Sequence, residues 1–64
     1  MEDYQLRVIE EEKQLKTKIV DLFNFIESDS FGELDSTECF LLRRQYEIMN
    51  DYDRVLKSRI ERFK

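Results

Sequence analysis

The feature that most constrains this sequence is its lack of helix breakers. The 64 residues contain no proline and a single glycine, Gly32, at the midpoint of the chain. Glycine and proline are the residues least compatible with a helix interior. A chain that has only one of them, at its centre, is expected to form two long helices that are joined near that glycine.

The first half has the apolar spacing of an α-helix. Residues 2–28 contain no breaker, and apolar side chains recur with steps of three, four and seven. This spacing places them in one row along a helix, as in a coiled-coil seam. We therefore predict a helix over residues 2–28, with a polar gap in its row at Glu11 and Glu12. The row consists of Met1, Tyr4, Val8, Leu15, Ile19, Leu22 and Ile26.

The connection is predicted at residues 29–35. Serine and aspartate in this segment favour turns, and Gly32 can adopt a positive φ. Phe31 and Leu34 are apolar within this polar segment. We expect these two side chains to cover the end of the hydrophobic core.

A strong signal for a helix start follows the connection. Asp35 and Glu38 have the spacing of a capping box, in which each side chain accepts a hydrogen bond from the backbone N–H of the other residue. Leu34 and Cys39 occupy the positions of a hydrophobic staple. The second helix is therefore predicted over residues 36–63.

Together these elements predict an all-α fold, an antiparallel two-helix hairpin in a single unit of residues 1–64. A short connection makes consecutive helices antiparallel neighbours. Small chains usually need disulfides, a metal or a partner chain for stability. Cys39 has no second cysteine to pair with, and a chain without histidine is not expected to hold structural zinc. The apolar row of the second helix is also too wide for one neighbour, so we expect a homo-oligomer, most simply a dimer that forms a four-helix bundle.

The charge is unevenly distributed along the chain. The net charge is −4, but residues 1–42 hold four basic and eleven acidic side chains, whereas residues 43–64 hold seven basic and four acidic ones. Either the two helices attract each other, or the second half presents a basic surface to an anion. An extended nucleic acid is not an expected partner, because the acidic first half would repel its phosphates.

The composition also bears on location and chemistry. The sequence has no apolar run of the ~20 residues that a membrane span needs and no signal-peptide pattern, so we expect no membrane partner. A free thiol fits a reducing compartment, so we expect the protein in the cytoplasm of the cell that makes it. Cys39 lacks a histidine base, and the carboxylates form no metal-binding loop pattern. We expect no enzyme activity, no cofactor and no metal.

Polar residues within the apolar rows are candidates for ligand binding. Antiparallel pairing centred near Gly32 places Glu12 roughly opposite Tyr52. A buried carboxylate needs a partner. Such a polar layer either fixes the register of the helices or lines a ligand pocket between chains.

Arginines beside tyrosines are the other candidates. Arginine binds phosphate through two hydrogen bonds, and tyrosine stacks on a base. One group follows the start of the second helix and consists of Arg43, Arg44 and Tyr46. The other is expected at the open end of the hairpin, where Tyr4 and Arg7 come near Arg59. Each residue can instead be a surface salt-bridge partner. The candidate ligand-binding residues are Tyr4, Arg7, Arg43, Arg44, Tyr46, Tyr52 and Arg59.

The order of these features resembles a set of very small phage proteins. The stretch YQLRVIEEEKQLKTKIVDLFNFIES, followed by the spaced pattern F-x-x-LD-x-x-E-x-x-LL, is similar to small helical-hairpin proteins related to a crAss-like phage. The resemblance extends from Tyr4 to Ile60. A looser likeness is to the helical-hairpin domain of phage anti-defence sponges, although this chain lacks the proline-containing loop of that domain.

The likeness to sponges implies a function. Those proteins form oligomers that sequester the cyclic nucleotides or cyclic ADP-ribose derivatives with which bacterial immune systems signal. By this resemblance, the chain is expected to bind a small cyclic nucleotide without turning it over. The residues alone leave two alternatives open. One is a module that inhibits a host defence or metabolic protein through an amphipathic helix face, and the other is a structural component of the phage.

Overall fold

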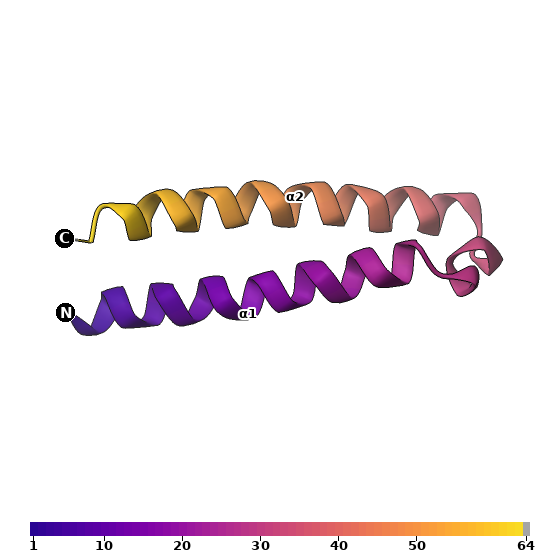
Figure 1. The fold of residues 1–64 in the computed structure, drawn as a ribbon. Helices are drawn as coiled ribbons and strands as arrows, with labels where there is room; N and C mark the ends of the chain where they lie inside the picture. Colours follow the sequence, from indigo (N-terminus) through magenta and orange to yellow (C-terminus); the bar gives the residue numbers. More distant parts are fainter. Residues whose placement is uncertain (64) are drawn as a thin grey trace.

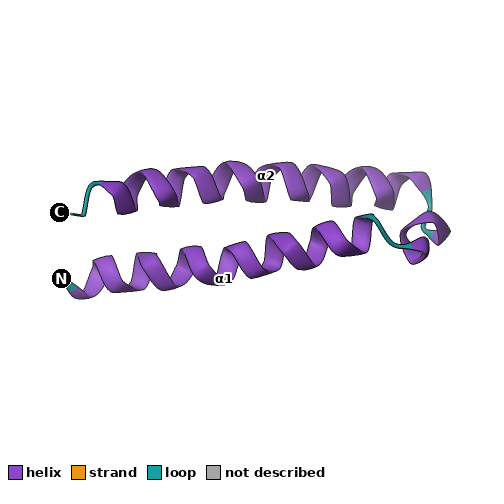
Figure 2. Ribbon diagram, viewed as in Figure 1, coloured by secondary structure: helices purple, strands orange, loops and turns teal. Residues whose placement is uncertain are grey.

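The computed structural model describes residues 1–63, and Lys64, one of the basic residues counted above, lies outside them. The described chain forms two long helices, α1 (Asp3–Ile26) and α2 (Ser36–Glu61), joined by a short 3₁₀ helix, η1 (Asp29–Glu33). The two helices run antiparallel, so both termini lie at one end (Figure 1). Nearly all of the ribbon is helical in Figure 2. The all-α hairpin predicted from the sequence is confirmed.

The hairpin is a thin rod. Its principal extents are 46 × 14 × 13 Å and its radius of gyration is 14.7 Å. A compact domain of this length would have a radius of gyration of about 11 Å. A rod of two helices leaves most of each helix facing outward. This shape therefore provides little interior in which to bury apolar side chains.

The connection differs from the predicted loop. Helix α1 ends at Ile26, two residues before the predicted end, and the Ser28 hydroxyl donates a hydrogen bond to the Phe25 carbonyl at 2.6 Å. Residues that were predicted as loop form η1 instead. Gly32 does not have a positive φ, because a 3₁₀ turn requires only ordinary right-handed backbone angles. A Cβ added at Gly32 would meet no heavy atom within 4 Å.

The start of α2 follows its sequence signal in part. The Asp35 carboxylate accepts a hydrogen bond from the Glu38 backbone N–H at 2.8 Å, as an N-cap residue does. Within residues 1–63 this is the only half of the predicted capping box that forms. The half-buried Cys39 thiol lies 3.5 Å from the Phe31 carbonyl oxygen and 3.8 Å from that of Leu34. The cap and the thiol together attach α2 to the connection.

The core is a narrow seam between the two helices. Val8 and Leu15 from α1 pack with Leu56 from α2, which is only 1% exposed. Burying such a side chain contributes about 1.5–3 kcal/mol. Partly buried neighbours extend the seam along the rod: Ile19, Met49, Ile60 and Phe63. Phe31 is buried at the closed end, where its ring meets the Phe25 ring edge to face at 6.1 Å. It therefore covers that end of the core, as the sequence predicted.

Candidate ligand-binding site

The open end of the hairpin carries a small cavity with basic and aromatic walls. Tyr4 from the first turn of α1 lines it with Arg59, Arg62 and Phe63 from the end of α2 and the residues just after it, around about 270 Å³. The Tyr4 and Phe63 rings meet edge to face, with centroids 5.7 Å apart and planes at 83°. This ring pair holds the two ends of the chain together and forms the apolar part of the cavity.

The two arginines of this cavity form no ion pair with the described residues. Among residues 1–63, no carboxylate lies within 4.0 Å of Arg59 or Arg62. By contrast, Arg44 pairs with Glu47 at 4.0 Å, and Arg54 pairs with Asp51. Arg59 and Arg62 also line a second cavity of about 300 Å³ with Arg54, Val55 and Ser58. Their N–H donors therefore remain available for an anion on two sides.

A third cavity, which is lined by an arginine and a tyrosine, lies near the closed end of the hairpin. Arg43 and Tyr46 line about 300 Å³ there together with Phe23, whose ring centroid lies 5.9 Å from that of Tyr46. The Arg43 guanidinium lies over the Phe31 ring, 5.1 Å from its centroid. Two glutamates, Glu27 and Glu47, also line the cavity. Their charges oppose the binding of a phosphate, so this end is less suited to an anion than the open end.

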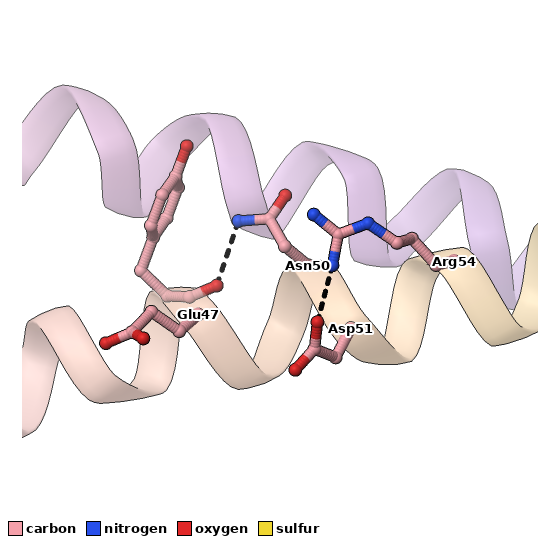
Figure 3. Close-up of a pocket in the computed structure, with 5 residues that line it drawn as sticks. Glu47, Asn50, Asp51 and Arg54 are labelled. Atoms are coloured by element: carbon pink, nitrogen blue, oxygen red, sulfur yellow. Dashed lines mark hydrogen bonds and ion pairs between the residues drawn. The ribbon is translucent and has the colours of Figure 1, made fainter.

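The largest of these four cavities is a groove along one helix (Figure 3). It has a volume of about 440 Å³ and is lined by α2 side chains alone, from Tyr46 to Arg54. The Asn50 amide donates to the Tyr46 backbone carbonyl at 2.9 Å, and Arg54 pairs with Asp51. The one arginine of the groove is thus neutralised within the groove. We therefore assign no anion site to it.

Two carboxyl groups face each other inside the seam. Glu12 on α1 and Asp53 on α2 are 8% and 7% exposed, and each has one buried oxygen that no protein donor satisfies. Lys16 lies 3.9 Å from the Glu12 carboxylate, and Lys57 lies 3.1 Å from that of Asp53. We interpret the two unsatisfied oxygens as the sites of one proton that the acids share when Glu12 is protonated. Glu12 was predicted to lie opposite Tyr52; the structure corrects this position to Asp53.

The pKa values of the two acids are shifted in opposite directions. The hydrogen bond that the Glu12 carboxyl donates to Asp53 raises the pKa of Glu12, and burial and the negative charge of Asp53 raise it further. Burial alone would raise the pKa of Asp53. The hydrogen bonds that Asp53 accepts from Glu12 and Lys57 outweigh burial and lower it. When the pair holds a single proton, the two shifts favour its placement on Glu12 and leave the negative charge on Asp53.

The sequence was compared with known families over its whole length. The family described as Sequestin matches residues 2–62. The chain belongs to the Sequestin family. It is also 43% identical over 61 residues, 95% of each chain, to the uncharacterised 7.5 kDa protein of the denB–rIIB intergenic region of Enterobacteria phage T4. The expected relation to small phage proteins is thereby confirmed. No solved structure matches this Sequestin chain.

Two further observations concern membrane-spanning helices and metal-binding groups. Within residues 1–63, no helix is long and apolar enough to cross a membrane. In the same part of the chain, no group of three or more histidine, cysteine, aspartate or glutamate side chains could hold a metal ion.

The structure separates the predicted ligand residues into groups. Tyr4 and Arg59 line the open-end cavity together, whereas Arg7, although exposed, lines none of the four cavities. Arg43 and Tyr46 share the closed-end cavity. The rod is 46 Å long, so these two groups cannot serve one small ligand within one chain.

The other two predicted residues lie apart from both cavities. Arg44 pairs with Glu47, and Tyr52 lies on the outer side of α2 with 44% of its surface exposed. Two residues that sequence reasoning missed matter more. Arg62 lies one helical turn after Arg59, a spacing that could have identified it. Asp53 continues the three-and-four spacing of the buried row, but its charge concealed this role.

Proposed function

We propose that this protein is a phage counter-defence protein that sequesters a small cyclic nucleotide in the host cytoplasm. It binds the nucleotide as a homo-oligomer and does not turn it over. The family name, Sequestin, supports sequestration as the mode of action. The likeness of the sequence to anti-defence sponges supports a nucleotide immune signal as the cargo.

One observation carries the proposal. Arg59 and Arg62 have no carboxylate partner among the described residues, and both lie at a cavity with the Tyr4 and Phe63 rings. A guanidinium pairs with a phosphate through two parallel hydrogen bonds, and an aromatic ring offers a stacking surface to a base. Both requirements of a nucleotide are met at this one cavity.

The size of the cavity supports the oligomer. Sites for small molecules usually enclose about 300–1,000 Å³, and the open-end cavity has about 270 Å³. One chain thus supplies the phosphate contacts and part of a base-binding wall. A neighbouring chain supplies the remaining wall.

Calorimetric titration with a panel of cyclic dinucleotides, cyclic trinucleotides and cyclic ADP-ribose tests the proposal. The wild type is expected to bind at least one member of the panel. The double variant R59A/R62A is expected to lose at least about 100-fold in affinity, since each charge-assisted contact is worth about 1.5–3 kcal/mol. The matched control R7A/R44A removes the same charge from arginines that line none of the four cavities and is expected to bind like the wild type. An equal loss of nucleotide affinity in both double variants would show that only the net charge of the protein matters, and it would refute the site.

A protein target is the second candidate function. The observation that favours it is the exposure of several large apolar side chains along the outer side of α2. Such a row can dock on a host protein as amphipathic helices commonly do. This function would replace nucleotide sequestration if the whole panel fails to bind and a purified host enzyme forms a stoichiometric complex that I48E abolishes.

A further inference from the structure

The hairpin exposes more surface than a folded monomer of its size. Its accessible surface is 5135 Å² for a mass of 7.9 kDa. A typical monomer of this mass exposes about 4,400 Å². The surplus of about 700 Å² is close to the ~800 Å² that each partner buries in a standard protein interface. The surplus therefore fits one interface per chain.

An apolar row along the outer side of α2 provides such an interface. Leu41, Ile48, Tyr52 and Val55 are each between 44% and 57% exposed. They follow one another with steps of seven, four and three, and Gln45 occupies the position that the step of seven skips. This is the spacing of a coiled-coil seam. Helix α2 thus has two seams, one buried against α1 and one that no residue of the hairpin covers.

The comparable row of α1 is interrupted by charge. Leu6, Val20 and Phe23 are exposed and share a three-and-four spacing with Ile9. The middle of that row, however, consists of Lys13 and Lys16. Covering it would remove two ammonium groups from water, which is costly without new partners. The α2 row has no charge between Leu41 and Val55.

We propose that a second copy of this chain covers the α2 row and that the two α2 helices pack antiparallel. In an antiparallel coiled coil the two types of seam position face each other. This rule allows registers in which the numbers of opposing residues add up to 93, 100 or 107. The register with a sum of 100 is the one that brings Glu38 opposite Arg62. The facing pairs are Ile48 with Tyr52 of the second copy, Gln45 with Val55, and Leu41 with Arg59.

The charges on α2 support the antiparallel direction. In a parallel pair, each residue faces its own counterpart. Arg59 would then face Arg59 of the second copy and Arg62 would face Arg62, so like charges would meet twice. In the antiparallel register, Arg62 lies opposite Glu38 of the second copy, so that opposite charges meet at each end of the interface. In the dimer this carboxylate partly neutralises Arg62, whereas Arg59 faces Leu41 and keeps its N–H donors for a phosphate.

The arrangement has a consequence for the open-end cavity. It places the first turns of α2 from the second copy beside Arg59 and Arg62, so each cavity gains a wall from the other chain. This interface specifies the homo-oligomer of the proposed function. It holds whether or not a nucleotide binds, so the two proposals can fail separately.

Sedimentation velocity of the nucleotide-free protein tests the surface. The wild type is expected to sediment as a dimer. I48E places a charge at the centre of the row and is expected to weaken self-association by at least about 30-fold, as loss of an interface hot spot does. The matched control V20E adds the same charge at a similarly exposed position on α1 and is expected to remain dimeric. A monomeric wild type, or dissociation by V20E but not by I48E, would overturn the proposal.

Disulfide formation tests the direction without depending on I48E. In a C39S background, V55C alone is expected to give no cross-linked dimer, because antiparallel packing separates the two copies of residue 55 by about 15 Å along the helix. Q45C/V55C is expected to cross-link fully, because residues 45 and 55 of opposite chains face each other. Cross-linking by V55C alone would show a parallel pair and contradict the proposed register.

Discussion

The Glu12 carboxyl donates a hydrogen bond to the Asp53 carboxylate across the buried seam between α1 and α2. The pair replaces one apolar layer of the core with two acids that share a proton. Lys16 and Lys57 lie at its edge and balance the remaining charge. An all-apolar layer at this point would be compatible with several registers of the two helices, whereas the acid pair is satisfied in only one.

The shared proton makes the stability of the hairpin depend on pH. The pKa of Glu12 is raised above 4.5, so its stabilising contribution is complete below about that value and is lost as the pH rises through the raised pKa. The pKa of Asp53 is lowered below 3.8, so its contribution is present above that value and is lost as the pH falls further. The free energy of unfolding is therefore expected to peak in mildly acidic solution.

E12Q is expected to abolish the decline on the alkaline side of this peak. The glutamine amide donates to Asp53 at every pH and carries no proton that can be lost. At pH 8 the variant is expected to exceed the wild type in free energy of unfolding by on the order of 1 kcal/mol, and at pH 4, below the ordinary pKa of Glu12, the two are expected to agree. Urea unfolding at both pH values measures this. The control E11Q changes the exposed neighbouring residue and should show the same pH dependence of unfolding free energy as the wild type. If the unfolding free energy of E12Q falls with rising pH as that of the wild type does, the shared proton is refuted.

Replacing both acids with leucine separates stability from specificity. E12L/D53L fills the layer with apolar side chains, and such replacements of buried ionic groups are often stabilising by about 1–4 kcal/mol. We expect a higher free energy of unfolding together with a mixture of oligomers, because the layer no longer selects one register. Urea unfolding and sedimentation velocity measure the two effects. A single oligomer identical to that of the wild type would show that the acids do not determine register.

Gly32 is not required by the connection. Its φ is not positive, and a Cβ at this position meets no neighbour within 4 Å. G32A is therefore expected to stabilise the hairpin by about 0.4–1 kcal/mol, because alanine restricts the unfolded chain more than glycine does. Thermal unfolding of G32A beside the wild type measures this. A lower melting temperature would show that the connection needs a conformation that alanine avoids.

Helical periodicity predicted the fold and most of the seam. Val8, Leu15 and Leu56 follow the three-and-four spacing, and the gap at Glu12 indicated a polar layer before the structure showed one. The partner of Glu12 was wrong by one residue. The register of a hairpin depends on how its connection is wound, and η1 shortens a segment that the sequence pattern treats as an open loop.

The ligand residues were harder to predict for a different reason. Antiparallel pairing placed Tyr4 near Arg59, and the structure brings them to one cavity. The sequence does not show which arginines are already neutralised. Arg44 and Glu47 are three residues apart, a common pairing distance on a helix, but many such residues remain apart. The structure was needed to separate Arg44 from Arg59, and the role of all seven candidates in binding stays a prediction.

Native mass spectrometry of the purified protein with and without the nucleotide panel is the most direct test of nucleotide sequestration. The expected result is a discrete oligomer that gains the mass of an intact cyclic nucleotide at a fixed number per chain and releases it unchanged. R59A, which leaves the proposed pair of Arg62 with Glu38 of the second copy intact, should form the same oligomer without the added mass. An oligomer that stays empty across the panel, or that returns a hydrolysed nucleotide, would contradict sequestration without turnover.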